Sequence, residues 1–168
     1  MTGETAARAP SAGSAEPGER PAGTLADRQA ALVAALVAGA PVPPGFDHRL
    51  VGVTRSALLG KRADDVARHW PLLRAGLGAR WPAVFTDWAA TRPTRGSLRD
   101  GWDLARQLAG EGPLPGPAAE ELAVREALWR YDGTTAPQRR RLPTVHRADG
   151  VTVLQVVGRI RLWSGRRR

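Results

Sequence analysis

The stretch Asp47–Pro71, DHRLVGVTRSALLGKRADDVARHWP, decides the fold expected for this chain. Asp47 can accept hydrogen bonds from the free N–H groups of a helix start, and Pro71 cannot continue a helix. At about 100° per residue, two apolar stripes face in nearly opposite directions. They are Leu50, Val53 and Ala57, and Leu59, Ala63, Val66 and Trp70. Either Gly60 breaks the helix and turns its second half, or one central helix is packed on both sides.

A basic ridge runs beside the second stripe, because Arg55, Arg62 and His69 recur at seven-residue spacing. Such a ridge can bind an anionic partner. It can equally be the solvated edge of the helix, with buried stems and wet charged heads.

The composition fits one domain with tails. The 168 residues include no cysteine, which excludes disulfides, zinc–thiolate sites and thiol nucleophiles and fits the cytoplasm, where we expect the protein. The N-terminus has no apolar segment typical of a secretory signal, and no apolar run approaches the roughly 20 residues that span a bilayer.

The net charge of +9 is concentrated near the C-terminus. Residues 138–168 carry nine arginines and one acid, whereas residues 1–137 are nearly neutral. Lys61 is the single lysine, and the abundance of Arg, Ala, Gly and Pro indicates a high-GC coding bias. The basic character is therefore weak evidence for nucleic-acid binding, although arginine does supply a bidentate donor for phosphate or carboxylate.

Four segments follow from these patterns: a disordered tail at 1–23, a helical domain at 24–133, a β-hairpin appendage at 134–163 and a basic tail at 164–168. Besides the stretch above, we expect five further helices or turns. They are Thr24 to Gly39, the short segment that ends at Gly78, a helix from Trp81-Pro82, a helix capped by Ser97 that ends at Gly110, and a helix from Ala118 to Tyr131.

Beyond Asp132 the apolar period changes from helical to alternating. RRRLPTVHR and VTVLQVVGRIRLW predict two strands joined at Asp149-Gly150, with a bulge at Gly158. An isolated hairpin is marginal in water, so this one must pack on the helices or pair with another chain. The fold class is mainly α: a bundle of five to six helices with a C-terminal β-hairpin.

Catalytic chemistry has little support. His48, His69 and His146 are far apart, no paired-histidine helix motif occurs, and no glycine-rich phosphate loop follows a strand. We expect no enzyme, metal or cofactor. The tryptophans (Trp70, Trp81, Trp88, Trp102 and Trp129) can stack on bases if exposed, but their helical spacing favours the core.

Glu126 lies between Leu122 and Trp129 on an apolar helix face. An acid there is either half of a buried ion pair with an arginine or a general acid, and the pair is favoured. Arg55 or Arg62 is the candidate partner, and we predict the structural pair Glu126–Arg55.

Arginines supply the predicted partner-binding residues. Arg92, Arg95 and Arg99 precede or begin a helix, whose free N–H groups attract anions; the alternative is a solvated loop. The predicted set is Arg55, Arg62, Arg92, Arg95, Arg147, Arg159 and Arg161. The terminal RRR is either a contact for nucleic acid or acidic protein, or a solvated tail.

Residues 29–133 resemble the helical N-terminal domain of HvfC/BufC-type partner proteins. The resemblance rests on TRSALLGKRADDVARHWP, LGARWPAVFTDWAATRPTRGSLRDGWDLARQLA and ELAVREALWRYDG with its central Glu126. It also covers a shorter actinobacterial group in which such a domain accompanies, or is fused behind, a multinuclear non-haem iron-dependent oxidative enzyme. The resemblance implies a non-catalytic protein that brings a ribosomally made precursor peptide to that enzyme. The helical domain has also been labelled DNA-binding.

Three functions follow. The first is an accessory protein for an iron-dependent peptide-modifying oxidase, in which residues 151–157 offer a strand edge and Arg159 and Arg161 face acidic groups. The second is a nucleic-acid-binding protein that uses the arginine-rich C-terminal segment. The third is a scaffold whose hairpin only completes its own core.

Overall fold

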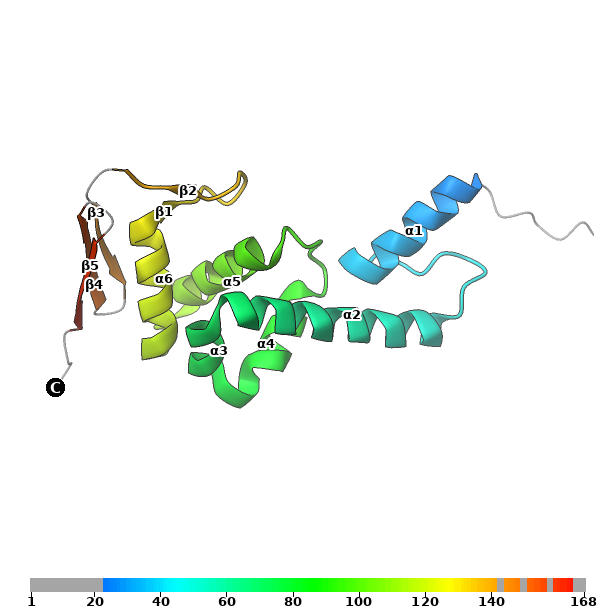
Figure 1. Cartoon of the computed structure of the whole chain (residues 1–168). Helices are drawn as coiled ribbons and strands as arrows, with labels where there is room; N and C mark the ends of the chain where they lie inside the picture. The colour runs from blue at the N-terminus through cyan, green and yellow to red at the C-terminus, as the bar shows by residue number, and fades with distance from the viewer. Residues whose placement is uncertain (1–22, 142–143, 149–150, 157–158, 165–168) are drawn as a thin grey trace, which may run out of the picture.

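The computed structural model describes residues 23–141, 144–148, 151–156 and 159–164. The elements are α1 (Leu25–Ala38), α2 (His48–His69), α3 (Pro71–Leu77), a 3-10 helix (Gly78–Arg80), α4 (Trp81–Ala89), α5 (Ser97–Glu111), α6 (Gly116–Leu128), β1 (Trp129–Arg130), β2 (Gln138–Arg139), β3 (Thr144–Ala148), β4 (Val151–Val156) and β5 (Arg159–Ser164). Figure 1 shows a helical body with α1 at one end beside α2 and a small sheet at the other end beside α6. The expected fold class, mainly α with a C-terminal hairpin, is confirmed.

The predicted central helix exists and continues through Gly60 as α2. Asp47 caps it, because its Oδ1 accepts from the backbone N of Arg49 at 2.7 Å and of Leu50 at 3.0 Å. The alternative of packing on both sides is wrong, however. Leu50 and Val53 on the first stripe are 65% and 63% exposed, so only the second stripe enters the core.

The core is organised around the C-terminal end of α2. Trp70 is fully buried and meets Trp102 of α5 edge-on, with ring centroids 5.8 Å apart. Its Nε1 donates to the carbonyl oxygen of Leu98 at 3.0 Å. Gly101 permits this approach, since a Cβ there would lie 2.6 Å from Cγ of Trp70. The predicted burial of Trp81, Trp88 and Trp102 is confirmed.

Helix boundaries match the expected ones at α1, where Thr24 forms a capping box with Asp27 and Gly39 ends the helix at φ 72°. Other predicted boundaries are wrong. Ser97 does not cap α5, because Gly96 holds the N-cap position and no side chain bonds there, and α5 runs past Gly110 to Glu111. The last helix stops at Leu128, where the backbone becomes extended.

The C-terminal strands form an antiparallel sheet in the order β3-β4-β5. The expected hairpin is confirmed, since Ala148 pairs with Val151 and Thr144 with Gln155. The second predicted strand, however, is two strands, because β4 and β5 are antiparallel neighbours with Val156 opposite Arg159. The turn Asp149-Gly150 and the bulge expected at Gly158 lie outside the described residues, as do the tails at 1–22 and 165–168.

The sheet packs on the helical body rather than standing alone: β3 and β4 contact α6, and α6 also contacts α3 and α5 (Figure 1). Both sides of α6 are therefore covered. Its alanines Ala119, Ala123 and Ala127, spaced four residues apart on one side, are all buried. Small side chains allow neighbouring elements to approach the helix closely. A separate pair, β1 with β2, joins the end of α6 to residues 138–139.

Candidate functional site

Arg62 forms an ion pair and a hydrogen bond within the protein rather than projecting into solvent as an unpaired cation. Its Nε donates to Asp100 Oδ2 at 2.9 Å and its Nη1 to the carbonyl oxygen of Arg92 at 2.7 Å. Its side chain is only 13% exposed. The guanidinium also lies 5.8 Å from the ring centroid of Phe85. A buried acid on α5, Asp100, neutralises its charge, and a partner-binding role for Arg62 stays a prediction.

The predicted anion site at the start of α5 is filled by the protein's own carboxylate. Asp100 is 1% exposed and accepts from the backbone N of Arg95 at 2.9 Å and from the hydroxyl of Thr94 at 2.7 Å. These bonds hold the loop before α5 against the first turn of the helix.

Arg92 and Arg95 are exposed, yet each has internal partners. Arg92 donates to the carbonyl oxygen of Trp88 at 2.6 Å and lies 5.3 Å from the centroid of that ring. Arg95 donates to the carbonyl oxygens of Gly133 and Thr134. These bonds hold the loop before α5 against the segment after α6. A partner-binding role for either residue stays a prediction.

Glu126 is buried and ion-paired with an arginine, but the partner is Arg106 and not Arg55. Arg106 Nε lies 2.6 Å from Glu126 Oε1, which also accepts from Trp102 Nε1 at 2.7 Å. Arg55 instead donates to the carbonyl oxygen of Ala90 at 2.5 Å. The predicted pair fails because α6 packs beside α5, which brings Arg106 rather than the first half of α2 to this carboxylate.

A second buried acid, Glu121, joins three helices. Its Oε2 accepts from the backbone N of Leu73 at 2.8 Å, which satisfies one of the free N–H groups at the start of α3. Its Oε1 accepts from Arg125 at 3.1 Å. Arg125 lies 4.1 Å from the ring centroid of Trp70. These contacts link α6 to α3 and to the end of α2.

Tyr131 and Asp103 form the one hydrogen-bonded pair with shifted pKa values on both sides among the described residues. Burial, followed by its hydrogen bond to Asp103, raises the pKa of Tyr131 to about 12. Burial likewise raises the pKa of Asp103, although the Tyr131 hydroxyl bond at 3.1 Å opposes it. Both shifts follow mainly from burial and from the environment that the two groups share.

The remaining predicted partner-binding residues are on the sheet. Arg147 lies in β3 opposite Thr152, and Arg159 and Arg161 lie in β5 opposite Val156 and Leu154. The structure describes these strand positions but not the three side chains. The predicted free edge at residues 151–157 is wrong for Val151–Val156, because β4 is the central strand. The edges are β3 and β5.

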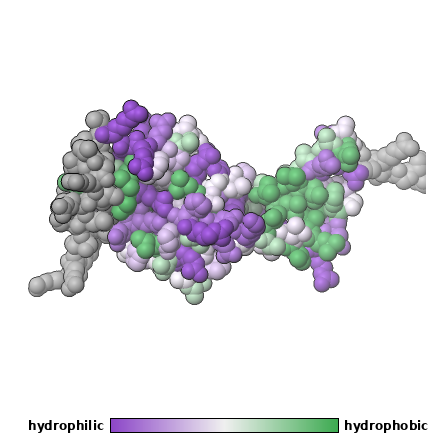
Figure 2. All heavy atoms as spheres, viewed as in Figure 1, coloured by the Kyte–Doolittle hydropathy of each residue, from purple (hydrophilic) through white to green (hydrophobic). Residues whose placement is uncertain are grey.

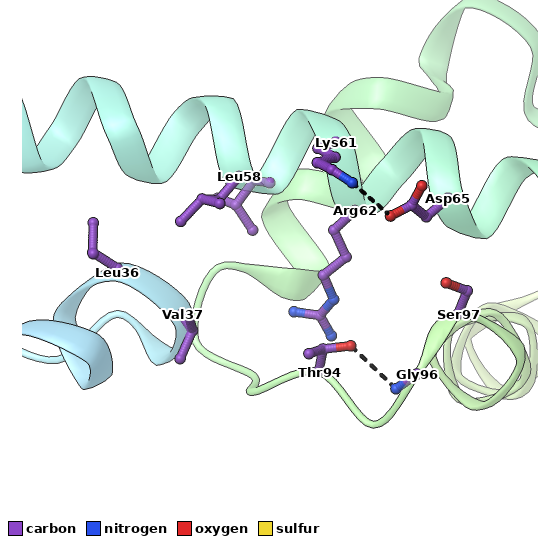
Figure 3. A pocket seen from close by; sticks show the side chains of 10 residues that line it. Leu36, Val37, Leu58, Lys61, Arg62, Asp65, Thr94, Gly96 and Ser97 are labelled. Atoms are coloured by element: carbon purple, nitrogen blue, oxygen red, sulfur yellow. Dashed lines mark hydrogen bonds and ion pairs between the residues drawn. The ribbon is translucent and has the colours of Figure 1, made fainter. Parts of the chain in front are cut away.

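A groove of about 220 Å³ lies between α1, α2 and the loop before α5. Leu36 and Val37 come from α1, Leu58 from α2 and Thr94 from the loop (Figure 3). Lys61 and Asp65 form an ion pair at its rim, 3.7 Å apart. We call this the α1–α2 groove.

Exposed apolar side chains gather on the two helices that form the α1–α2 groove. Figure 2 shows them gathered over α1 and the adjoining part of α2. The large exposed ones on these two helices are Leu25, Val33, Val37, Leu50, Val53 and Leu58. Six such residues on two neighbouring helices form a larger apolar surface than scattered single residues explain.

Sequence reasoning missed this groove and the two buried acids Glu121 and Asp100. Glu121–Arg125 has the four-residue spacing of a helical ion pair and was readable from the sequence. Asp100 pairs with a residue 38 positions away, for which the sequence carries no signal. The groove depends on how α1 lies on α2, which periodicity does not determine.

Neither a metal-ligand cluster nor a membrane-spanning helix occurs in the part of the chain that the structure describes. There, no three histidine, cysteine, aspartate or glutamate side chains gather as metal ligands would. Over the same residues, no helix combines the length and apolar character needed to cross a membrane.

The helices and the antiparallel sheet that packs on them form a small, mainly helical domain, and the α1–α2 groove lies on its surface. The chain belongs to the family described as SCO6045-like, C-terminal domain, whose sequence pattern matches residues 26–110. It is 39% identical over 132 residues to a UPF0276 protein of Streptomyces avermitilis. That match covers 78% of this chain and 27% of the relative, so the chain spans about a quarter of the relative's length. No solved structure matches.

Proposed function

We propose that this chain is a non-catalytic partner protein that binds a multinuclear non-haem iron-dependent oxidative enzyme, or the precursor peptide that such an enzyme modifies. The resemblance of residues 29–133 to HvfC/BufC domains suggests this role. The observation that carries it is that a domain like this one makes up 27% of a longer UPF0276 protein. Joining two parts in one polypeptide raises their effective concentration, which favours parts that work on each other.

The side chains support binding rather than catalysis. The most deeply placed charges, Asp100, Glu121 and Glu126, each bond to arginines or backbone groups that hold helices together. The exposed apolar residues of α1 and α2 offer a surface for another protein. The alternative is nucleic-acid binding through the arginine-rich C-terminal segment, where residues 138–168 carry nine arginines and one acid. We place the proposed role in the cytoplasm, which suits a chain without cysteine.

The test is a purification of the tagged chain from its native host, with mass spectrometry and iron analysis of the proteins that accompany it. We expect an iron-containing oxidative enzyme or its precursor peptide, and we expect the purified chain to raise the rate of peptide modification. The tag alone is the control. Recovery of neither component, together with an unchanged modification rate, would contradict the proposal.

A further inference from the structure

We propose that the α1–α2 groove is the docking site for an acid-flanked amphipathic helix of the partner protein. The inference rests on the proposed function, because it names the surface through which the partner is held. It is separate from the sheet edges, at which an extended peptide would add as a strand.

The groove suits apolar side chains rather than a small-molecule ligand. Its volume of about 220 Å³ lies below the roughly 300–1,000 Å³ of typical ligand pockets. Leu36, Val37 and Leu58 line it, and the last two are 40% and 41% exposed. A space of this size takes one or two anchoring side chains, which is how helices dock into apolar grooves.

The walls favour a helix over a strand. α1 and α2 form two sides of the groove, and the backbone N–H and C=O groups within a helix bond to each other. No ladder of backbone hydrogen bonds is therefore offered to an extended peptide at these walls. Binding depends on side chains, spaced at three or four residues on the incoming helix.

Residues 1–22 and 165–168 are unsuitable occupants of the groove. Residues 1–22 contain no large apolar side chain after Met1, and residues 165–168 read Gly-Arg-Arg-Arg. Neither segment can fill an apolar groove. In the Streptomyces relative, by contrast, the matched part is joined to further polypeptide that makes up most of the protein. That polypeptide is the kind of partner we infer.

Charge at the rim favours an acidic partner. Lys61 and Arg68 share a single carboxylate, Asp65, and their side chains are 74% and 68% exposed. Acidic residues beside the apolar anchors of the partner would meet this excess of positive charge and speed the encounter.

The experiment co-expresses the tagged 168-residue chain with the Streptomyces relative from which the matching 132 residues have been removed. Two single variants, Val37→Asp and Leu58→Glu, place a charge in the groove. Leu72→Glu is the matched control, because Leu72 is similarly exposed, at 39%, but lies on α3 away from the groove. Circular dichroism and the melting temperature confirm that each variant folds.

We expect the wild-type chain and Leu72→Glu to co-purify equally with the shortened relative. Each groove variant should recover about tenfold less or lower still, as expected when a charge enters an apolar contact. Equal recovery by all four chains would overturn the groove and leave the proposed function standing. Recovery by none, wild type included, would overturn both. Self-association of the wild-type chain in sedimentation, abolished by Val37→Asp, would assign the groove to a second copy and also overturn the inference.

Discussion

At the scale of single residues, Gly101 is the position where the core tolerates least change. A Cβ added there would overlap the ring of Trp70, which is fully buried and cannot move aside. We expect Gly101→Ala to lower the free energy of unfolding by about 1–3 kcal/mol, the usual cost of overpacking a core. Chemical denaturation followed by tryptophan fluorescence measures this change.

Gly110 in the same helix is the control for that substitution. Nothing lies within 4 Å of the position that its Cβ would take. Gly110→Ala should therefore raise stability by about 0.5–1 kcal/mol, because alanine restricts the unfolded chain and favours the helix. Equal effects of the two substitutions would contradict the close packing of α5 on Trp70.

Tyr131 is the single tyrosine, so its ionisation can be followed without overlap from others. Its pKa is raised to about 12 by burial and by Asp103, whereas an unfolded tyrosine titrates near about 10. Between these two values the unfolded chain loses the proton first, so stability should fall as the pH rises through that window. Asp103→Asn should lower the pKa of Tyr131. Ultraviolet titration of the phenolate measures the pKa of Tyr131 in the wild type and in Asp103→Asn. A wild-type pKa of about 10 would contradict the argument that burial raises it.

Individual residues also show which features of the core and of the site are predictable from the sequence. Helical spacing predicted that Trp81, Trp88 and Trp102 are buried, because one period is enough to define a buried face. It also predicted an arginine partner for Glu126. It did not predict that Arg106 is this partner, since choosing among arginines requires the packing of α6 on α5.

At the scale of elements, the Arg62–Asp100 pair joins α2 to α5. We expect Asp100→Ala to lower the free energy of unfolding by about 3–5 kcal/mol, because it leaves the largely buried guanidinium of Arg62 without its counter-charge. The double variant Arg62→Met with Asp100→Leu should lose less than the single one, as apolar pairs often replace buried ion pairs at small cost. Urea unfolding of both variants measures the difference.

Asp65→Ala is a control for this pair. Asp65 also pairs with cations, Lys61 and Arg68, but those side chains are exposed. Exposed ion pairs contribute about 0–1 kcal/mol, so this variant should unfold almost like the wild type. If Asp65→Ala and Asp100→Ala lowered the free energy of unfolding by similar amounts, burial would not be the reason why the Arg62–Asp100 ion pair is strong.

The C-terminal strands show what the alternating apolar pattern of the sequence does not predict. The alternating pattern predicted strands after Asp132, and those strands exist. It did not show that the second apolar run folds back on itself as β4 and β5. Alternation is the same along one long strand and along two shorter ones, so the reversal depends on the connection between them. This difference moves the candidate strand edges to β3 and β5.

At the scale of the whole molecule, α1 is held less firmly than the rest of the helical body. Its one buried residue is Ala35, while Leu25 and Val33 are 70% and 55% exposed. Few buried contacts mean a low free energy of local opening. We expect the amides of α1 to exchange with deuterium at least about tenfold faster than those of α5, a difference of about 1.4 kcal/mol in opening free energy.

Docking at the α1–α2 groove should remove part of that difference. An occupant that contacts Leu36 and Val37 holds α1 against α2, so α1 opens less often. The part of α5 beyond Ser97, which does not line the groove, exchanges as before. Hydrogen–deuterium exchange of the chain alone and co-purified with the shortened Streptomyces relative measures this protection. Added protection on β3 or β5 but none on α1 would place the partner on the sheet edges instead.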